Sequence, residues 1–332
     1  MRAITLDSRE ESKLLLTEVQ TRTLLPGEVR VLIKAAALNH RDEWCRKGLY
    51  PNIQNGVVLG SDGAGIVTEI GEGVAYDWLQ KEVIINPALN WGENQKVQSA
   101  SFEILGMPRN GTLAESVIVP VDRLHDKPTH MSWEEAGALP LAGLTAFRAL
   151  TYQGDIQEGE NLLVTGFGGG VAQFAVQFGM ALGANVSTSS SSPEKLARAK
   201  AMGVSNTFNY LDHNWITKAV DDTNGFDLII DGAVGDTLNH LIQVAKPGGK
   251  IVCYGATLGN PSKIEARKIF WNQLKIMGTT MGSDLDFKNM VALVCEKKIQ
   301  PIIDQVFKFD QAEMAFDRMR DGKQTGKIVL VP

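Results

Sequence analysis

The sequence predicts an α/β protein of two domains: a β-rich domain followed by a doubly wound parallel sheet with helices on both faces. The chain has 332 residues, more than one ordinary hydrophobic core encloses. Its first third alternates short apolar runs with turn residues, and from residue 126 onward helical and strand-like segments alternate. Repeated strand–helix units are typical of a parallel sheet covered by helices.

The β-rich part has apolar runs of strand length that end at Pro-Gly and Gly-rich turns. Because such short strands with frequent turn signals are typical of closed or sandwiched sheets, we expect one barrel-like domain. The strand-like runs occupy residues 2–7, 14–19, 28–38, 64–71, 82–87 and 115–121.

A cluster of glycines stands between two apolar elements near the middle of the chain. The run 162–164 is strand-like, Gly166, Gly168, Gly169 and Gly170 follow, and from Val171 apolar residues recur with helical spacing. A second strand-like run begins at residue 186. A strand, a glycine turn, a helix and a strand form the unit that binds a pyrophosphate at a helix N-terminus.

The glycine spacing admits two registers. Gly166 and Gly168 fit a GxGxxG pattern whose third glycine is replaced by Val171, whereas Gly166, Gly169 and Ala172 give a better fit that ends in a small residue. The alternative is a glycine-rich turn without a ligand, but four glycines carry a conformational cost that a plain loop avoids.

The end of the second strand predicts which nicotinamide is bound. A preference for NAD usually needs an Asp or Glu there, and this strand ends in four serines, 189–192, followed by Lys195 and Arg198. Hydroxyl groups and an ammonium suit a 2′-phosphate, so we expect NADP(H), held by Ser190, Ser191 and Lys195. In the alternative, the serines only cap the next helix and the cations are solvated.

Composition excludes several classes of protein. Lys and Arg total 33 against 38 Asp and Glu with no basic cluster, so nucleic acid is not expected as a partner. No apolar run approaches the ~20 residues of a membrane span, and the first residues lack the apolar core of a signal peptide. The three cysteines form no CxxC pair, which favours a reducing cytoplasm.

Several collinear motifs resemble the medium-chain dehydrogenase/reductase superfamily over nearly the whole chain. They are ALNHRDEWCRKGLYP, LGSDGAGIVTEIGEGV, VTGFGGGVAQFAVQFGMALGANV and the terminal TGKIVLV. The likeness is greatest to the zinc-free quinone oxidoreductase branch and its zinc-type alcohol dehydrogenase-like relatives. It implies a GroES-like catalytic domain over 1–141, a Rossmann NADP(H)-binding domain over 142–284, and a segment 285–332 that returns to the catalytic domain.

The departures from that family concern zinc. Where zinc-dependent members carry a cysteine and a histidine ligand, this chain has Asn39 and Ser61, the latter beside Asp62, and the segment 86–111 that would hold a structural zinc contains no cysteine. A zinc site needs three or four suitable ligands, so we expect no metal. An alternative site built from His40, Asp42, Cys45 and Asp62 remains open, because His40 and Asp42 would share one face of a strand.

The resemblance also implies roles for other residues. Asn39, Trp44 and Tyr50 match positions that approach the nicotinamide or line the substrate cleft, and the alternative is that Trp44 and Tyr50 are only core residues. The remaining positions match cofactor contacts in the family: Thr145, Tyr210, Gly255, Thr257 and Lys327.

These observations predict a cytoplasmic, metal-free reductase that transfers a hydride from NADPH to a small quinone, enone or aldehyde. Two alternatives remain: a zinc-type alcohol dehydrogenase, and a nucleotide-binding redox sensor without turnover. The resemblance further implies a homodimer joined through the Rossmann domains, with the segment 280–284 as a candidate contact.

Overall fold

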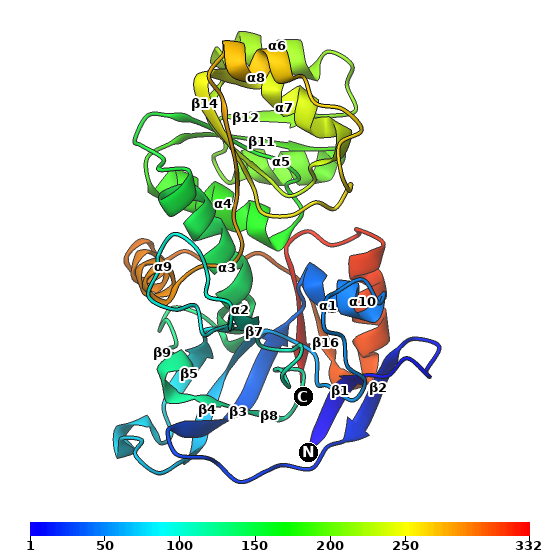
Figure 1. The fold of residues 1–332 in the computed structure, drawn as a ribbon, viewed down its shortest axis with the longest axis vertical. Helices are drawn as coiled ribbons and strands as arrows, with labels where there is room; N and C mark the ends of the chain where they lie inside the picture. Colours follow the sequence, from blue (N-terminus) through cyan, green and yellow to red (C-terminus); the bar gives the residue numbers. More distant parts are fainter. The chain divides into compact units, whose positions relative to one another are not determined.

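The computed structural model describes all residues from 1 to 332 and divides into two compact units (Figure 1). Unit 1 contains Met1–Leu144 and Gly282–Pro332, and unit 2 contains Thr145–Met281. The predicted boundaries, after residues 141 and 284, each lie three residues away from these. Both units are β-sheet structures with covering helices, which confirms the predicted fold class.

Unit 1 is built on a seven-stranded sheet of order β16-β17-β3-β4-β5-β9, with β8 paired to β3. This order leaves β16 and β9 as edges, so the hydrogen bonds of the sheet do not close the predicted barrel. Two further pairs are β1-β2 and β6-β7. The strands are β1 (Arg2–Leu6), β2 (Leu14–Glu18), β3 (Glu28–Ala37), β4 (Asp62–Ile70), β5 (Glu82–Ile85), β6 (Ala88–Leu89), β7 (Glu103–Ile104), β8 (Ser116–Pro120), β9 (Leu124–Asp126), β16 (Ile303–Lys308) and β17 (Lys327–Val331).

Four helices lie within unit 1, and a fifth joins it to unit 2. They are α1 (His40–Arg46), α2 (Trp133–Ala138), α9 (Asp284–Lys297) and α10 (Ala312–Arg320), and α3 (Pro140–Arg148) carries the chain into unit 2. A π-helical turn, Ala149–Gln153, continues α3, and short 3-10 turns occur at Tyr76–Trp78, Val121–Arg123, Gly235–Thr237 and Phe309–Gln311.

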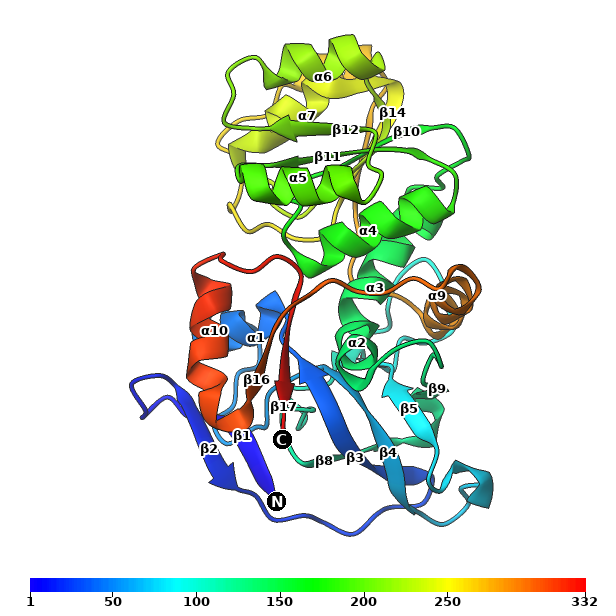
Figure 2. The same ribbon diagram turned by 180° about the vertical axis from the view of Figure 1, so that it is seen from behind.

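The C-terminal segment packs into the core of unit 1. Strand β17 pairs antiparallel with β3, with Leu330 opposite Ala36, and α10 lies beside α1, as both ribbon views show (Figures 1 and 2). Phe316 of α10 is fully buried among the apolar residues of the sheet. The neighbouring Asp317 forms an ion pair with Arg46, with 2.9 Å between Oδ1 and Nη1. Residues of the far C-terminus therefore reach the same core as residues near position 40.

Unit 2 is a six-stranded parallel sheet of order β12-β11-β10-β13-β14-β15, the arrangement of a doubly wound dinucleotide-binding fold. Helices α4 and α5 cover one face and α6, α7 and α8 the other (Figure 1). The elements are β10 (Asn161–Val164), α4 (Gly170–Ala181), β11 (Asn185–Ser190), α5 (Pro193–Ala201), β12 (Asn206–Asn209), α6 (Trp215–Thr223), β13 (Phe226–Asp231), α7 (Leu238–Val244), β14 (Ala245–Cys253), α8 (Ala266–Trp271) and β15 (Lys275–Gly278).

The sequence pattern predicts that the helix before β14 runs up to Pro-Gly-Gly, but α7 ends at Val244. Strand β14 begins at Ala245 and passes through these residues, with Gly248 at φ +78° and a register shift against β13. Glycine tolerates this positive φ, so an irregular strand start replaces the last turn of the helix. No helix in the structure is both long enough and apolar enough to cross a bilayer.

Candidate functional site

The glycine turn between β10 and α4 presents an open surface of backbone. Gly166 has φ +68°, Gly169 is the N-cap of α4, and no side chain caps this twelve-residue helix. A Cβ atom added to Gly166 or Gly169 would meet no atom within 4 Å, so the space above the turn is free for a ligand. Backbone N–H groups and the positive end of the helix dipole favour a phosphate there.

The turn is held in place from below. Phe167 is buried and donates its N–H to the carbonyl oxygen of Ser189 at 2.8 Å, which ties the turn to strand β11. Further along α4, a Cβ on Gly179 would lie 2.5 Å from Leu162, so this glycine allows the helix to approach β10. The glycine pattern predicts this close approach at Ala172, whereas the structure shows it at Gly179.

The serine-rich end of β11 is adjacent in the fold to Tyr210. The Tyr210 hydroxyl donates to Ser191 Oγ at 3.0 Å, and Ser190 Oγ accepts from the N–H of Ser192 at 3.2 Å. Ser192 caps α5 by accepting from the N–H of Lys195, as expected. The structure therefore brings together three predicted cofactor residues, Ser190, Ser191 and Tyr210.

The side chain of Lys195 crosses the glycine turn. A Cβ on Gly168 would lie 2.9 Å from Lys195 Nζ, so the ammonium stands over the turn rather than in open solvent. Arg198, the other candidate cation, is exposed. The structure therefore places the Lys195 ammonium beside the glycine turn.

A second loop of unit 2 lies at the carboxyl end of β13. The carbonyl oxygen of Gly232 accepts from the N–H and hydroxyl groups of Thr257 at 3.2 and 3.3 Å, and Gly255 packs beside that carbonyl. Buried Asp231 accepts from Thr165 Oγ1 at 2.5 Å and from the N–H of Val234 at 2.7 Å.

These contacts hold Val234 at φ +56°, an unusual conformation for a β-branched residue. The sequence analysis did not single out Asp231 or Val234. The position of Asp231 at the end of a central parallel strand is the signal that marks it. The last predicted cofactor residue of this unit, Thr145, is 5% exposed, with its hydroxyl 4.0 Å from Met281 Sδ.

In unit 1, Asn39, Asp62 and Lys327 form a buried network. Lys327 Nζ donates to Asn39 Oδ1 at 2.7 Å, to Asp62 Oδ2 at 2.8 Å and to the carbonyl oxygen of Leu38 at 2.8 Å. Asn39 Nδ2 donates to Asp62 Oδ2 at 2.9 Å, and Asp62 Oδ1 accepts from the N–H of Leu141 at 2.7 Å. Lys327, expected at the cofactor, has its ammonium fully occupied inside this unit.

Arg41 forms a second cationic contact beside this network. Its Nη1 donates to Ser61 Oγ at 2.5 Å and to the carbonyl oxygen of Leu105 at 2.7 Å, and its Nε donates to the Tyr50 hydroxyl at 3.3 Å. The guanidinium carbon also lies 4.8 Å from the centre of the Tyr50 ring. Because Arg41 occupies a lone pair of the Tyr50 oxygen, the hydroxyl hydrogen remains for another acceptor.

Trp44 and Tyr50 are both half-buried. Lys47 Nζ lies 5.4 Å from the centre of the Trp44 ring, whereas Tyr50 packs against the core of unit 1. The Tyr50 ring is thus partly structural while its hydroxyl is engaged by a cation; Trp44 takes no part in the network.

The alternative metal site is not supported. His40 and Asp42 lie in helix α1, where residues two apart point in different directions, and no three His, Cys, Asp or Glu side chains are close enough to hold a metal ion. Asp42 accepts from the N–H groups of Asn39 and Gly60, and its burial raises its pKa.

The residues at the family's zinc positions do not suit a zinc ion. Asn39 and Asp62 are bound to the Lys327 ammonium, and Ser61 is bound to the Arg41 guanidinium. The oxygen atoms that could ligate a metal ion therefore already accept hydrogen bonds from two cations. A dication would have to displace or approach both positive charges. It would also find an amide and a hydroxyl where zinc prefers thiolate and imidazole.

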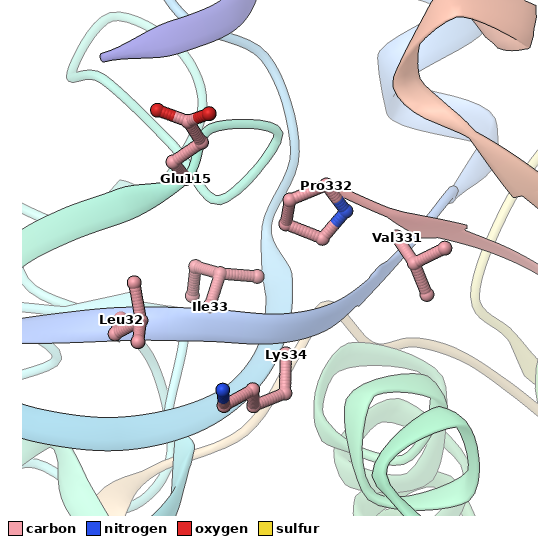
Figure 3. A pocket seen from close by; sticks show the side chains of 6 residues that line it. All are labelled: Leu32, Ile33, Lys34, Glu115, Val331 and Pro332. Carbon is pink, nitrogen blue, oxygen red and sulfur yellow. The ribbon is translucent and has the colours of Figure 1, made fainter.

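Unit 1 also contains a pocket of about 430 Å³, open to solvent (Figure 3). It lies at the end of β17 opposite to Lys327 and next to strand β3. Its lining residues are Leu32, Ile33, Lys34, Glu115, Val331 and Pro332, none of which the sequence analysis proposed as a site residue. Glu115 is paired with Arg2, so the pocket lacks a convergent polar cluster.

The six-stranded parallel sheet with its glycine turn is a Rossmann-type fold, and it is joined to a β-rich unit. Residues 25–129 match the alcohol dehydrogenase GroES-like domain and residues 170–296 match the zinc-binding dehydrogenase model. The chain belongs to the medium-chain dehydrogenase/reductase superfamily, among the zinc-type alcohol dehydrogenase-like proteins.

Several relatives resemble the chain over nearly its whole length. It is 36% identical to the zinc-type alcohol dehydrogenase-like protein YogA of Leptosphaeria maculans, covering 92% of this chain and 90% of that protein. It is 37% identical to the zinc-type alcohol dehydrogenase-like protein C1773.06c of Schizosaccharomyces pombe, covering 92% and 91%. A crystal structure of an NAD-dependent alcohol dehydrogenase superposes with a TM-score of 0.95 at 34% identity, covering all of both chains.

Proposed function

We propose that this protein transfers a hydride from NADPH to a quinone or an α,β-unsaturated carbonyl compound without a metal ion. The observation that carries the proposal is the pair of buried cations, Lys327 and Arg41, bound to Asn39, Asp62 and Ser61. Zinc in such enzymes acts as a Lewis acid on a carbonyl oxygen. A site without suitable zinc ligands is suited to acceptors that need weaker activation.

The choice of NADPH rests on the serine-rich strand end. Ser190, Ser191 and Tyr210 offer hydroxyl groups and Lys195 offers a positive charge. The strand ends in serines where an NAD-preferring site usually carries an Asp or Glu, and the first carboxylate beyond it is Glu194 in α5. Some relatives are named as NAD-dependent, so family membership alone does not decide the nicotinamide, and we assign the preference in this chain to these residues. Ser190 and Lys195 would hold the 2′-phosphate, and the glycine turn the pyrophosphate.

The chemistry follows from where negative charge develops. The bound cofactor supplies a hydride, which adds to the β-carbon of an enone while the carbonyl π electrons move to oxygen as an enolate; a proton from solvent then reaches the α-carbon. This charge is spread over several atoms, so a few hydrogen bonds stabilise it, whereas an isolated ketone puts full alkoxide charge on one oxygen. The Tyr50 hydroxyl, with Arg41 on its lone pair, is the donor we assign to that oxygen.

One relative's name agrees with conjugated acceptors. The chain is 26% identical to a crotonyl-CoA reductase of Streptomyces avermitilis, covering 99% of this chain and 84% of that protein. Crotonyl thioesters are α,β-unsaturated. The names of other relatives favour a second candidate, alcohol oxidation by a zinc-type enzyme, and this remains the competing activity.

The assembly we propose is a homodimer in the cytoplasm. Strand β15 is an unpaired edge of the parallel sheet of unit 2, and Phe270 and Trp271 of the preceding helix are 67% and 80% exposed. A second copy would pair the edge and cover these aromatic side chains. The three unpaired cysteines agree with a reducing compartment. A mass of one chain in gel filtration at micromolar concentration would refute the dimer.

The proposed reaction is tested by a parallel screen. NADPH and NADH oxidation are followed with small quinones, enones, aldehydes and aliphatic ketones, and the reverse reaction is followed with alcohols and both oxidised cofactors. We expect the highest kcat/KM for NADPH with a quinone or an enone. Efficient turnover of simple ketones with inert enones and quinones would show that the assigned chemistry is wrong, and no turnover at all would favour a nucleotide-binding sensor.

A further inference from the structure

The side-chain amide of Asn39 has one chemically defined orientation. An ammonium only donates hydrogen bonds and an ionised carboxylate only accepts them. Lys327 therefore selects Oδ1 at 2.7 Å, and Asp62 selects Nδ2 at 2.9 Å, so the amide cannot be turned over without two repulsive contacts. These two hydrogen bonds fix the orientation of the Asn39 side-chain amide.

Lys327 does not itself face a ligand. Its side chain is 3% exposed, and its three N–H groups are taken by Asn39 Oδ1, Asp62 Oδ2 and the carbonyl oxygen of Leu38. Whatever Lys327 does for a bound molecule must pass through Asn39 or Asp62. A charge-assisted hydrogen bond to an amide oxygen draws electron density from the amide and makes its N–H groups better donors.

Asn39 has one N–H group left. Its Nδ2 carries two hydrogens, of which Asp62 accepts one, and no group of the chain accepts the other. The residue is the N-cap of helix α1 and is 7% exposed, so its amide group is held on a rigid support.

We propose that Lys327 is a positioning residue that turns Asn39 into a hydrogen-bond donor for the oxygen of the acceptor. The inference rests on the proposed reduction of a conjugated carbonyl. Asn39 donates its second Nδ2 hydrogen to the oxygen that becomes the enolate or hydroquinone anion. Lys327, in contact with Asn39 Oδ1, strengthens that donor as the negative charge grows. Asp62 completes the arrangement by holding the first hydrogen.

A double-mutant cycle tests the connection between the two residues. Lys327→Met should lower kcat for the best acceptor about tenfold, a smaller loss than removal of a direct donor causes, because Lys327 acts through Asn39. It should leave the dissociation constant of NADPH unchanged within about twofold. In an Asn39→Ala background, the same substitution should change kcat by less than about twofold, because the residue through which Lys327 acts is absent.

Two controls separate positioning from folding. Lys327→Met combined with Asp62→Asn removes both charges, so no carboxylate is left buried alone, and it should show the same loss of kcat with a normal near-UV circular dichroism spectrum. Lys246→Met removes another lysine paired with an aspartate, Asp227 at 2.6 Å, and should leave kcat unchanged. Equal losses of kcat from Lys327→Met with and without Asn39 would overturn the proposal, as would a loss of NADPH affinity alone.

A readout independent of turnover distinguishes this inference from the proposed function. If the native protein reduces no acceptor, the proposed function fails, and the state of the Asn39 amide still decides the inference. In a ¹⁵N spectrum, the side-chain amide signal that disappears in Asn39→Ala should exchange slowly with deuterium in the native protein and rapidly in Lys327→Met. An Asn39 signal that is unaffected by Lys327→Met would refute the orienting role.

Discussion

The two candidate sites of this molecule are built in different ways. The candidate nucleotide site of unit 2 consists mainly of backbone from one glycine turn, next to a strand end fewer than thirty residues further along the chain. The network of unit 1 consists of side chains from Asn39, Asp62 and Lys327, of which the outer two are 288 residues apart in sequence. A site made of backbone tolerates little beyond glycine, whereas a site made of side chains changes chemistry through single substitutions.

The largest effect is expected at the glycine turn. Gly169→Val should abolish NADPH binding, because the new side chain fills the open space above the turn where the pyrophosphate would lie. Gly169 has φ −81°, which other residues also adopt, and it makes no side-chain cap. The substitution should therefore lower the free energy of unfolding by no more than about 1 kcal/mol. Fluorescence titration with NADPH and a thermal melt measure the two quantities. Normal NADPH affinity in this variant would show that the nucleotide does not bind at the glycine turn of unit 2.

The next effect concerns the strand end. Ser190→Asp places a carboxylate beside the expected 2′-phosphate and should weaken NADPH binding by about 1 to 3 kcal/mol, roughly five- to 150-fold, with little change for NADH. Arg198→Ala serves as the control, because that side chain is exposed and should not affect either cofactor. The KM values for both cofactors report the outcome. A native protein that uses NADH as well as NADPH would contradict the assignment.

A smaller effect is expected in unit 1. Tyr50→Phe should lower kcat about tenfold, since it removes one hydrogen-bond donor and leaves the ring packed against the core. Arg41 would lose only its 3.3 Å contact to the hydroxyl. Steady-state kinetics with the best acceptor measure the change. A loss beyond about a thousandfold would mean that Tyr50 is an essential acid rather than one donor among several.

The smallest effect is expected from metals. Treatment with a chelator followed by dialysis, or addition of zinc, should leave kcat/KM within about twofold, because Lys327 and Arg41 occupy the donors that a metal would need. Elemental analysis of the purified protein accompanies the assay. Activity lost on chelation and restored by zinc would show that the protein is a zinc-dependent enzyme, as its family name suggests.

The two sites also differ in how far sequence predicts them. The glycine turn, Ser192 as helix cap and the parallel strands follow from residues close together in the chain, and the structure places them as expected. Thr165 directly follows β10 and Asp231 ends the neighbouring strand β13, so their contact depends on strand order, which local patterns do not encode.

The sequence predicts only part of the network of unit 1. The resemblance singled out Asn39 and Lys327 separately, the second as a cofactor contact, and gave Asp62 no role beyond an alternative metal site. Their contact depends on β17 pairing with β3 in a register set by packing across the whole sheet. A buried lysine beside an aspartate is also indistinguishable in sequence from an exposed pair, because burial is a tertiary property.

The most direct test of the account follows the transferred hydrogen. NADPH carrying deuterium at the transferable position of the nicotinamide is incubated with the protein and an enone, and the product is analysed by NMR. We predict deuterium on the former β-carbon, with an intact carbonyl group. Deuterium on the carbonyl carbon, giving an allylic alcohol, would show that the protein reduces the carbonyl directly and would contradict a site built for conjugated acceptors.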